Sequence, residues 1–220
     1  MKSLLIVLAA LIAAPAERQA PPIFQPGAPG AAPRVITAGE SLALSRTGFI
    51  EADVRFMQHM IVHHAQAVEM VALMPDRASS AAVRRLGERI AASQAAEIGF
   101  MREWLLSRQR PIEGADPHRA HHGHEGRADA QMMPGMLSPA RMQALAAVDG
   151  PEFDRLFLEG MIQHHQGALD MVDVLNADTQ AAEDPLLSDF AASVAADQSA
   201  EILRMRSILS ALPNPAEDRP

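Results

Sequence analysis

The stretch from Asp53 to Met74, DVRFMQHMIVHHAQAVEMVALM, occurs twice in this chain. The second copy runs from Asp154 to Leu175, DRLFLEGMIQHHQGALDMVDVL, 101 residues further along. The copies share a phenylalanine, two flanking methionines and an adjacent pair of histidines at matching places. Core packing alone does not require this pattern, so the repeat predicts a chemical site that is present twice.

Apolar residues recur along each copy in steps of four and three, the period of a helix with one buried face. This predicts helices over residues 49–74 and 152–176. Two further stripes predict partner helices, one ending before Pro111 and one capped by Asp184-Pro185 and ending near residue 212. These stripes contain Ile90, Gln94, Glu97, Met101 and Trp104, and then Val194, Gln198, Glu201, Met205 and Ile208. The predicted fold is all-α, an antiparallel four-helix bundle of ferritin-like type built from two duplicated αα-hairpins.

The segments around the bundle have their own composition. Lys2, an apolar run and an Ala-Pro-Ala end predict a secretory signal peptide, with an uncleaved anchor as the alternative. Pro- and Ala-rich sequence then predicts a flexible tether, with a capping box before a short helical piece. We expect a signal peptide at 1–16, a tether at 17–38, one bundle domain at 39–212 and a tail at 213–220. The bundle domain is expected to consist of a first hairpin at 39–108, a linker at 109–137 and a second hairpin at 138–212. Short helical pieces are expected at 41–46 in the first hairpin and at 140–148 in the second.

Composition excludes several classes of function. The formal charge of −8 argues against nucleic acid, whose binding proteins carry a basic face. The absence of cysteine excludes disulfides and thiolate metal sites. With no later apolar run long enough for a membrane span, we expect a periplasmic or secreted protein that is soluble after signal cleavage.

Methionine and histidine are the soft ligands that the chain contains. At 100° per residue, Met60, His63 and Met70 fall on the face that the bundle buries. His64 points sideways to the neighbouring helix, where Glu97 or Gln94 is expected to meet it. Thioether sulfur with imidazole nitrogen favours soft metals, Cu(I) above all, whereas Ca²⁺ and Mg²⁺ prefer oxygen ligands and zinc leaves the methionines unexplained. The alternative is that the methionines only fill the core and the histidines are hydrogen-bonded core residues.

Glu97 and Glu201 interrupt apolar stripes, where a carboxylate is costly unless it is paired. Each can accept an N–H from a histidine of the neighbouring helix, which fixes the ring tautomer and serves metal binding indirectly. Each can instead be a metal ligand itself, which would favour iron or zinc. The further candidates, as ligands or as partners of ligands, are Met57, His59, Gln94, Met101, Gln198 and Met205. In the linker, His118, His121, His122 and His124, with Met132, Met133 and Met136 after them, form a candidate surface Cu(II) or zinc site, and the alternative is a solvated polar loop.

The doubled Met, His-His, Met motif and the Gln-x2-Glu-Ile-x2-Met stretches at 94–101 and 198–205 resemble the CopM-like family. The resemblance covers residues 42–212 without the linker. It implies a ferritin-like four-helix bundle in an exported protein, and the family, long catalogued as a domain of unknown function, includes periplasmic copper-binding proteins linked to copper resistance. The copper ligands that it implies are Met60, His63, His64, Met70, Met161, His164, His165 and Met171.

These observations predict a non-enzymatic exported protein that binds copper for sequestration, resistance or delivery to a partner or efflux protein. A ferritin-like di-metal oxidase is the first alternative, although no helix carries the Glu-x-x-His motif of di-iron sites. A metal-free helical interaction module is the second. The number of metal sites and homodimer formation stay open.

Overall fold

The computed structural model describes residues 23–25, 32–37, 48–113 and 132–213, and the chain divides into two units, 1–46 and 47–220. In the first unit, β1 (Ile23–Gln25) pairs antiparallel with β2 (Arg34–Ile36), with Phe24 opposite Val35. The tether prediction did not include this pairing, which the β-prone residues within the Pro- and Ala-rich stretch support. The expected signal peptide, the helical piece at 41–46 and the linker histidines lie outside the described residues.

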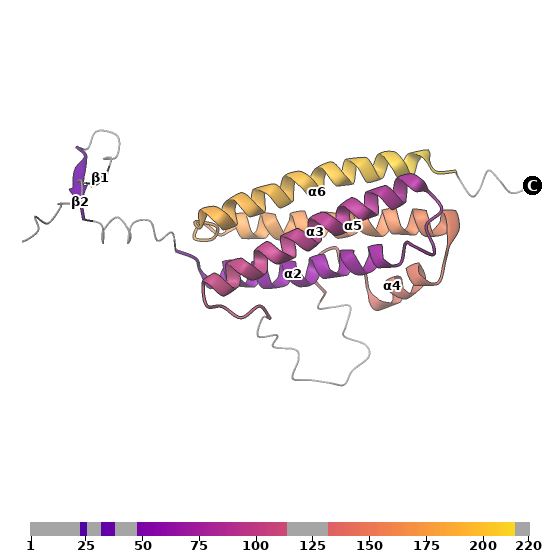
Figure 1. Ribbon diagram of the computed structural model, residues 1–220, viewed down its shortest axis with the longest axis horizontal. Helices are drawn as coiled ribbons and strands as arrows, with labels where there is room; N and C mark the ends of the chain where they lie inside the picture. The colour runs from indigo at the N-terminus through magenta and orange to yellow at the C-terminus, as the bar shows by residue number, and fades with distance from the viewer. Residues whose placement is uncertain (1–22, 26–31, 38–47, 114–131, 214–220) are drawn as a thin grey trace, which may run out of the picture. The chain divides into compact units, whose positions relative to one another are not determined.

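The second unit is the predicted four-helix bundle (Figure 1). Its long helices are α2 (Glu51–Ala72), α3 (Ala81–Ser107), α5 (Gly150–Ala177) and α6 (Pro185–Ala211), and the short α4 (Pro139–Ala146) precedes α5. The chief packing partners are α2 with α3, α5 with α6, and α2 with α5. The all-α prediction is therefore confirmed, and the helix boundaries agree with the predicted ones within a few residues.

Polar caps begin α3 and α6, and the cap at Asp184 is the one that the sequence predicts. The Ser80 hydroxyl accepts the N–H of Val83 at α3, and the Asp184 carboxylate accepts that of Leu187 at α6. Proline occupies the first turn of α4, α5 and α6, where its missing N–H costs nothing.

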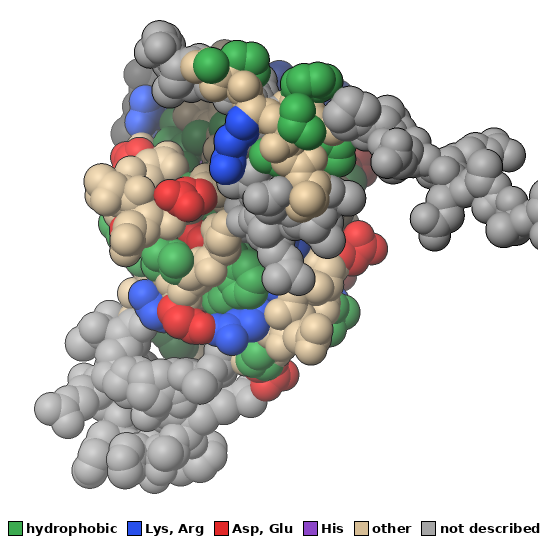
Figure 2. Space-filling model, turned by 90° about the vertical axis from the view of Figure 1, so that its left-hand side faces the viewer, with side chains coloured by type: hydrophobic (Ala, Val, Ile, Leu, Met, Phe, Trp, Pro, Cys, Tyr) green, Lys and Arg blue, Asp and Glu red, His purple; other side chains and the backbone are tan. Residues whose placement is uncertain are grey.

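None of the helices that the structure describes is long and apolar enough to cross a membrane. At the end of the bundle seen in Figure 2, acidic and basic side chains are interspersed.

Two equivalent aspartates tie the hairpins together. Asp53 of α2 accepts the backbone N–H of Ala182, at 2.9 Å, in the loop before α6. Its copy in α5, Asp154, accepts the Ser79 hydroxyl at 2.5 Å and the Ser80 N–H at 2.7 Å, in the loop before α3. Both aspartates are fully buried. Each hairpin thus satisfies backbone groups in the loop of the other.

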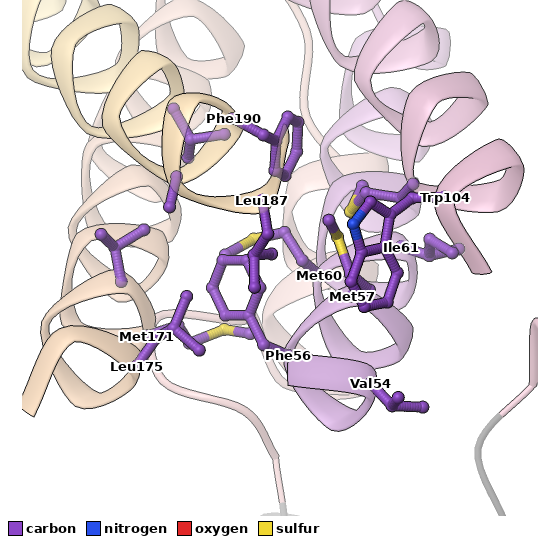
Figure 3. Packing of buried hydrophobic residues seen from close by; sticks show 14 of the residues in the cluster. Val54, Phe56, Met57, Met60, Ile61, Trp104, Met171, Leu175, Leu187 and Phe190 are labelled. Carbon is purple, nitrogen blue, oxygen red and sulfur yellow. The ribbon is translucent and has the colours of Figure 1, made fainter. Parts of the chain in front are cut away.

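The buried side chains form two hydrophobic clusters, one toward each end of the bundle. The first contains Met60 of α2 and Met171 of α5, with contributions from α3 and α6. Figure 3 shows side chains of all four helices converging in this cluster. The second contains Met70 of α2 and Met161 of α5. Because α2 and α5 are antiparallel, each cluster contains one of the two methionines that flank the histidines in each copy of the repeat.

Candidate metal centre

Four histidines lie at the middle of the bundle, between the two clusters. His63 and His64 come from α2, and His164 and His165 from α5, and all four are fully buried. The ring centroids of His63 and His164 are 3.9 Å apart, whereas those of His63 and His64 are 6.4 Å apart and those of His164 and His165 6.3 Å. The repeat therefore produces one central group of imidazoles, with one ring from each copy in direct contact.

The outer two rings donate to carboxylates on the neighbouring helix of their own hairpin. His64 Nε2 lies 2.5 Å from Glu97 Oε2, and His165 Nε2 lies 2.6 Å from Glu201 Oε2. The carboxylates are only 17% and 15% exposed. The Ser93 hydroxyl donates to the second oxygen of Glu97 at 3.1 Å. The predicted sideways orientation of His64 toward Glu97 is confirmed, and the second hairpin repeats it.

The inner two rings donate to backbone carbonyls. His63 Nε2 lies 2.9 Å from the Pro134 oxygen, and His164 Nε2 lies 2.9 Å from the backbone oxygen of His63. A carbonyl oxygen can only accept, so Nε2 carries the proton in both rings. This partner differs between the two halves, since the copy of His63 binds a helix carbonyl rather than a loop carbonyl.

The four bonds together place a proton on Nε2 of all four rings, and in the neutral form of each ring Nδ1 then keeps its lone pair. Each Nδ1 is buried and has no hydrogen-bond partner within the part of the chain that the structure describes. Burial lowers the pKa of His63 to about 4, since desolvation outweighs the hydrogen bond to Pro134 that favours the charged form. Burial likewise lowers the pKa of His164 well below its usual value, and the nearby imidazoles act in the same direction. The inner rings are therefore neutral at pH 7, as metal ligation requires.

Two buried glutamine side chains also have polar atoms without hydrogen-bond partners among the described residues. Gln94 of α3 and Gln198 of α6 are each 2% exposed. Neither the side-chain oxygen nor the nitrogen of either residue has a partner among the described residues. An unpaired buried polar group costs about 1–3 kcal/mol. The four histidines and two glutamines with unpartnered buried atoms thus form three equivalent pairs, a recurrence that accidental packing does not explain.

The methionines lie on both sides of the histidines. Met60 with Met171 belongs to the first cluster, and Met70 with Met161 to the second, all with exposed fractions of at most 9%. Across the described residues, no three His, Cys, Asp or Glu side chains are grouped so as to hold a metal ion. A metal at this centre would therefore need thioether or amide ligands besides imidazole.

Other candidates from the sequence are distributed differently. His59 is exposed on α2, so the structure does not bring it to the centre. Met57 and Met101 are buried in the first cluster and Met205 in the second.

Sequence reasoning missed the residues that cover His63. Residues 132–137, here called the strap, lie against α2 and α5. The Gln66 amide donates to the Leu137 oxygen at 2.9 Å and accepts the Leu137 N–H at 2.7 Å. A Cβ on Gly167 would lie 1.9 Å from the Pro134 oxygen, so only glycine permits this approach. The one signal in the sequence was that Gly167 stands in the second copy where Gln66 stands in the first.

A family model described as a domain of unknown function, DUF305, matches residues 53–209. The chain belongs to the DUF305 family. This confirms the resemblance to CopM-like proteins, because CopM is among the solved structures that are similar to the chain. No protein in the curated set matches it.

Three solved structures illustrate the likeness of this DUF305 chain. A DUF305 protein from Streptomyces coelicolor is 32% identical, over 72% of this chain and 92% of that one, with a TM-score of 0.59. A DUF305 fragment from Deinococcus radiodurans is 30% identical, over 74% and 99%, with a TM-score of 0.62. CopM in its Cu(I)-bound form is 26% identical, over 74% and 98%, with a TM-score of 0.56. CopM has also been solved in Cu(II)-bound and Ag-bound forms.

Proposed function

We propose that this protein is an exported copper-binding protein that holds Cu(I) at its central histidines, for sequestration, resistance or delivery to a partner. The observation that carries the proposal is the set of four buried Nδ1 lone pairs without partners among the described residues. A neutral imidazole whose other nitrogen is held by a carboxylate or carbonyl is the usual form of a histidine ligand.

The donor set favours a soft ion. Each end of the histidine group faces a cluster with four buried methionines, and thioether with imidazole selects Cu(I) over Zn²⁺, Ca²⁺ or Mg²⁺. CopM, a similar structure, has been solved with Cu(I), Cu(II) and Ag. The proposed ligands are His63, His64, His164 and His165, with Met60 and Met171 on one side and Met70 and Met161 on the other. Two flanking methionine pairs favour two ions, one on each side.

In this proposal Glu97 and Glu201 orient the ligands and do not bind metal. Each carboxylate accepts the Nε2–H of a histidine, so it fixes the tautomer that frees Nδ1. A ferritin-like di-metal oxidase would use such carboxylates as metal ligands. Their engagement with imidazole favours a binding role over an oxidase.

We propose export because residues 1–16 resemble a signal peptide. The similar protein from Streptomyces coelicolor is named as a candidate secreted protein. Delivery implies a protein partner that accepts Cu(I), and efflux systems are the class that such a carrier serves.

The test is an anaerobic Cu(I) titration that counts the equivalents bound against a chromogenic chelator. His63→Gln with His64→Gln is expected to lose Cu(I) while keeping its helical circular dichroism. His59→Gln, an exposed histidine of the same helix, is the matched control and should bind as the parent does. Unchanged stoichiometry in the double variant would overturn the proposal. Copper that fails to raise the melting temperature would favour the metal-free interaction module.

A further inference from the structure

The strap contains a tight turn that groups three methionines. The Met136 N–H donates to the Met133 oxygen at 3.2 Å, which closes a turn with Pro134 and Gly135 at its centre. Gly135 has φ +77°, so the turn has the features of type II, with proline first and glycine second. The Cα atoms of the first and last residues of such a turn lie within about 7 Å. Met133 and Met136 are therefore neighbours, and Met132 precedes them directly.

These methionines differ from the rest in exposure. Eight methionines of the four long helices and their connections are buried, from Met57 to Met205. Those of intermediate exposure in the described part of the chain are Met132, Met133 and Met136 of the strap and Met142 of α4. Partly exposed methionines, on a chain with a buried Met/His centre, are accessible to a soft ion in solution before the fully buried ones.

The turn is also bonded to the centre. The Pro134 oxygen, within the turn, accepts the Nε2–H of His63. Met133 packs against the first cluster, which holds Met60, whereas Leu137 belongs to the second. The strap thus crosses the histidine level from one cluster to the other. Gln163 of α5 donates to the Gly135 oxygen at 3.2 Å, so the turn is held from both helices.

We propose that Met132, Met133 and Met136 form a capture site for a soft monovalent ion, Cu(I) or Ag(I), that loads the buried histidines beneath. The delivery step rests on the proposed function of the centre, whereas capture by the strap does not. An ion bound at the turn lies over His63, and a shift of the turn that breaks its hydrogen bonds to His63 and Gln163 would open the path. In the second half, His164 donates to the His63 oxygen of α2 instead of to a loop, so among the described residues the strap is bonded to the His63 ring and not to the His164 ring. Loading therefore proceeds from the His63 side.

The test follows methionine ε-methyl signals by ¹³C NMR while Ag(I), a redox-stable probe, is added to the purified full chain. Single Met→Leu variants assign the signals. The three strap methyls are expected to shift, and to do so no later than those of Met60 and Met70. Strap methyls that stay unmoved at every Ag(I) ratio would overturn the proposal. Strap shifts without any change at Met60 and Met70 would leave the capture site standing and count against the proposed function.

Kinetics test delivery. In M132L/M133L/M136L, leucine preserves apolar volume, so the bundle is expected to fold and reach the parent's final Met60 and Met70 shifts. In the parent, stopped-flow competition with a chromogenic chelator is expected to show a fast phase of Ag(I) uptake through the strap. The triple variant should lose this fast phase. Met142→Leu, also partly exposed but outside the turn, is the control and should keep that phase. A triple variant that loads as fast as the parent would refute delivery through the strap.

Discussion

Gly167→Ala changes one hydrogen to a methyl group at the point where the strap meets α5. The new Cβ would lie 1.9 Å from the Pro134 oxygen and 2.5 Å from the Gly135 Cα, so backbone must move. Because α5 is a long packed helix and the strap is short, we expect the strap to move away from α5.

The cost can be worked from what the strap contributes there. Leu137 is 3% exposed, and burial of such a side chain stabilises by about 2 kcal/mol. The two hydrogen bonds between Gln66 and the Leu137 backbone add about 1 kcal/mol each. Alanine in place of glycine within a helix returns about 1 kcal/mol. The free energy of unfolding should therefore fall by about 3 kcal/mol.

Urea unfolding of the metal-free protein, followed by circular dichroism, measures this change. Gly99→Ala in α3 is the matched control, because a Cβ there meets nothing within 4 Å. It should raise the free energy of unfolding by up to about 1 kcal/mol. A Gly167→Ala protein as stable as the parent, or stabilised like the control, would refute the seating of the strap on α5.

The remaining predictions concern the carboxylates and the buried rings. Glu97→Gln and Glu201→Gln should each weaken Cu(I) binding about 10–100-fold in chelator competition, because the amide no longer enforces the ring tautomer. Unchanged affinity in both variants would show that the carboxylates do not orient the histidine ligands. Asp154→Ala should lower the free energy of unfolding by about 2–3 kcal/mol in urea, because it leaves the Ser80 N–H unpaired, and a change near zero would contradict the tie to the 79–80 loop. Metal-free protein should lose roughly 3 kcal/mol between pH 7 and pH 4 from His63 alone, because the unfolded chain protonates it near 6.5 while the folded pKa is about 4. The lowered pKa of His164 should add to this loss. Stability that stays flat over this range, measured by urea unfolding at several pH values, would contradict the burial of a neutral ring.

The helices and the outer histidine contacts were predictable because they follow from period alone. A step of one residue turns a helix by 100°, so the second histidine of each pair must face a neighbouring helix, and the glutamate on that helix interrupts an apolar stripe. The duplication gave a second, independent instance in His165 and Glu201. Periodicity that agrees in two copies is strong evidence for a fold.

His59 shows where the angular reasoning was inaccurate. The sequence places Met60, His63 and Met70 on the buried face, and His59 lies about 40° from His63 on an ideal helix. In the structure the buried arc of α2 is centred between His63 and His64, so His59 falls outside it and is exposed. The position of that arc depends on where α3 and α5 pack, which no local pattern encodes.

The same offset explains why the strap could not be foreseen. His63 sits near the edge of the buried arc, and the strap completes its burial. The seat for the strap depends on a missing Cβ at Gly167 and on an amide at Gln66, two contacts that join distant parts of the chain. The preceding linker has no period from which its path can be inferred.

Because of the reciprocal aspartates, the two hairpins depend on each other as the two subunits of a dimer do, although they belong to one polypeptide. Asp53 serves the loop of the second hairpin and Asp154 serves that of the first, so each half lacks a needed acceptor when it is alone. A backbone cut between residues 113 and 132 would remove neither bond. Two separately made halves should therefore find each other and rebuild the whole, and an ancestral single hairpin would have had to pair with its own twin.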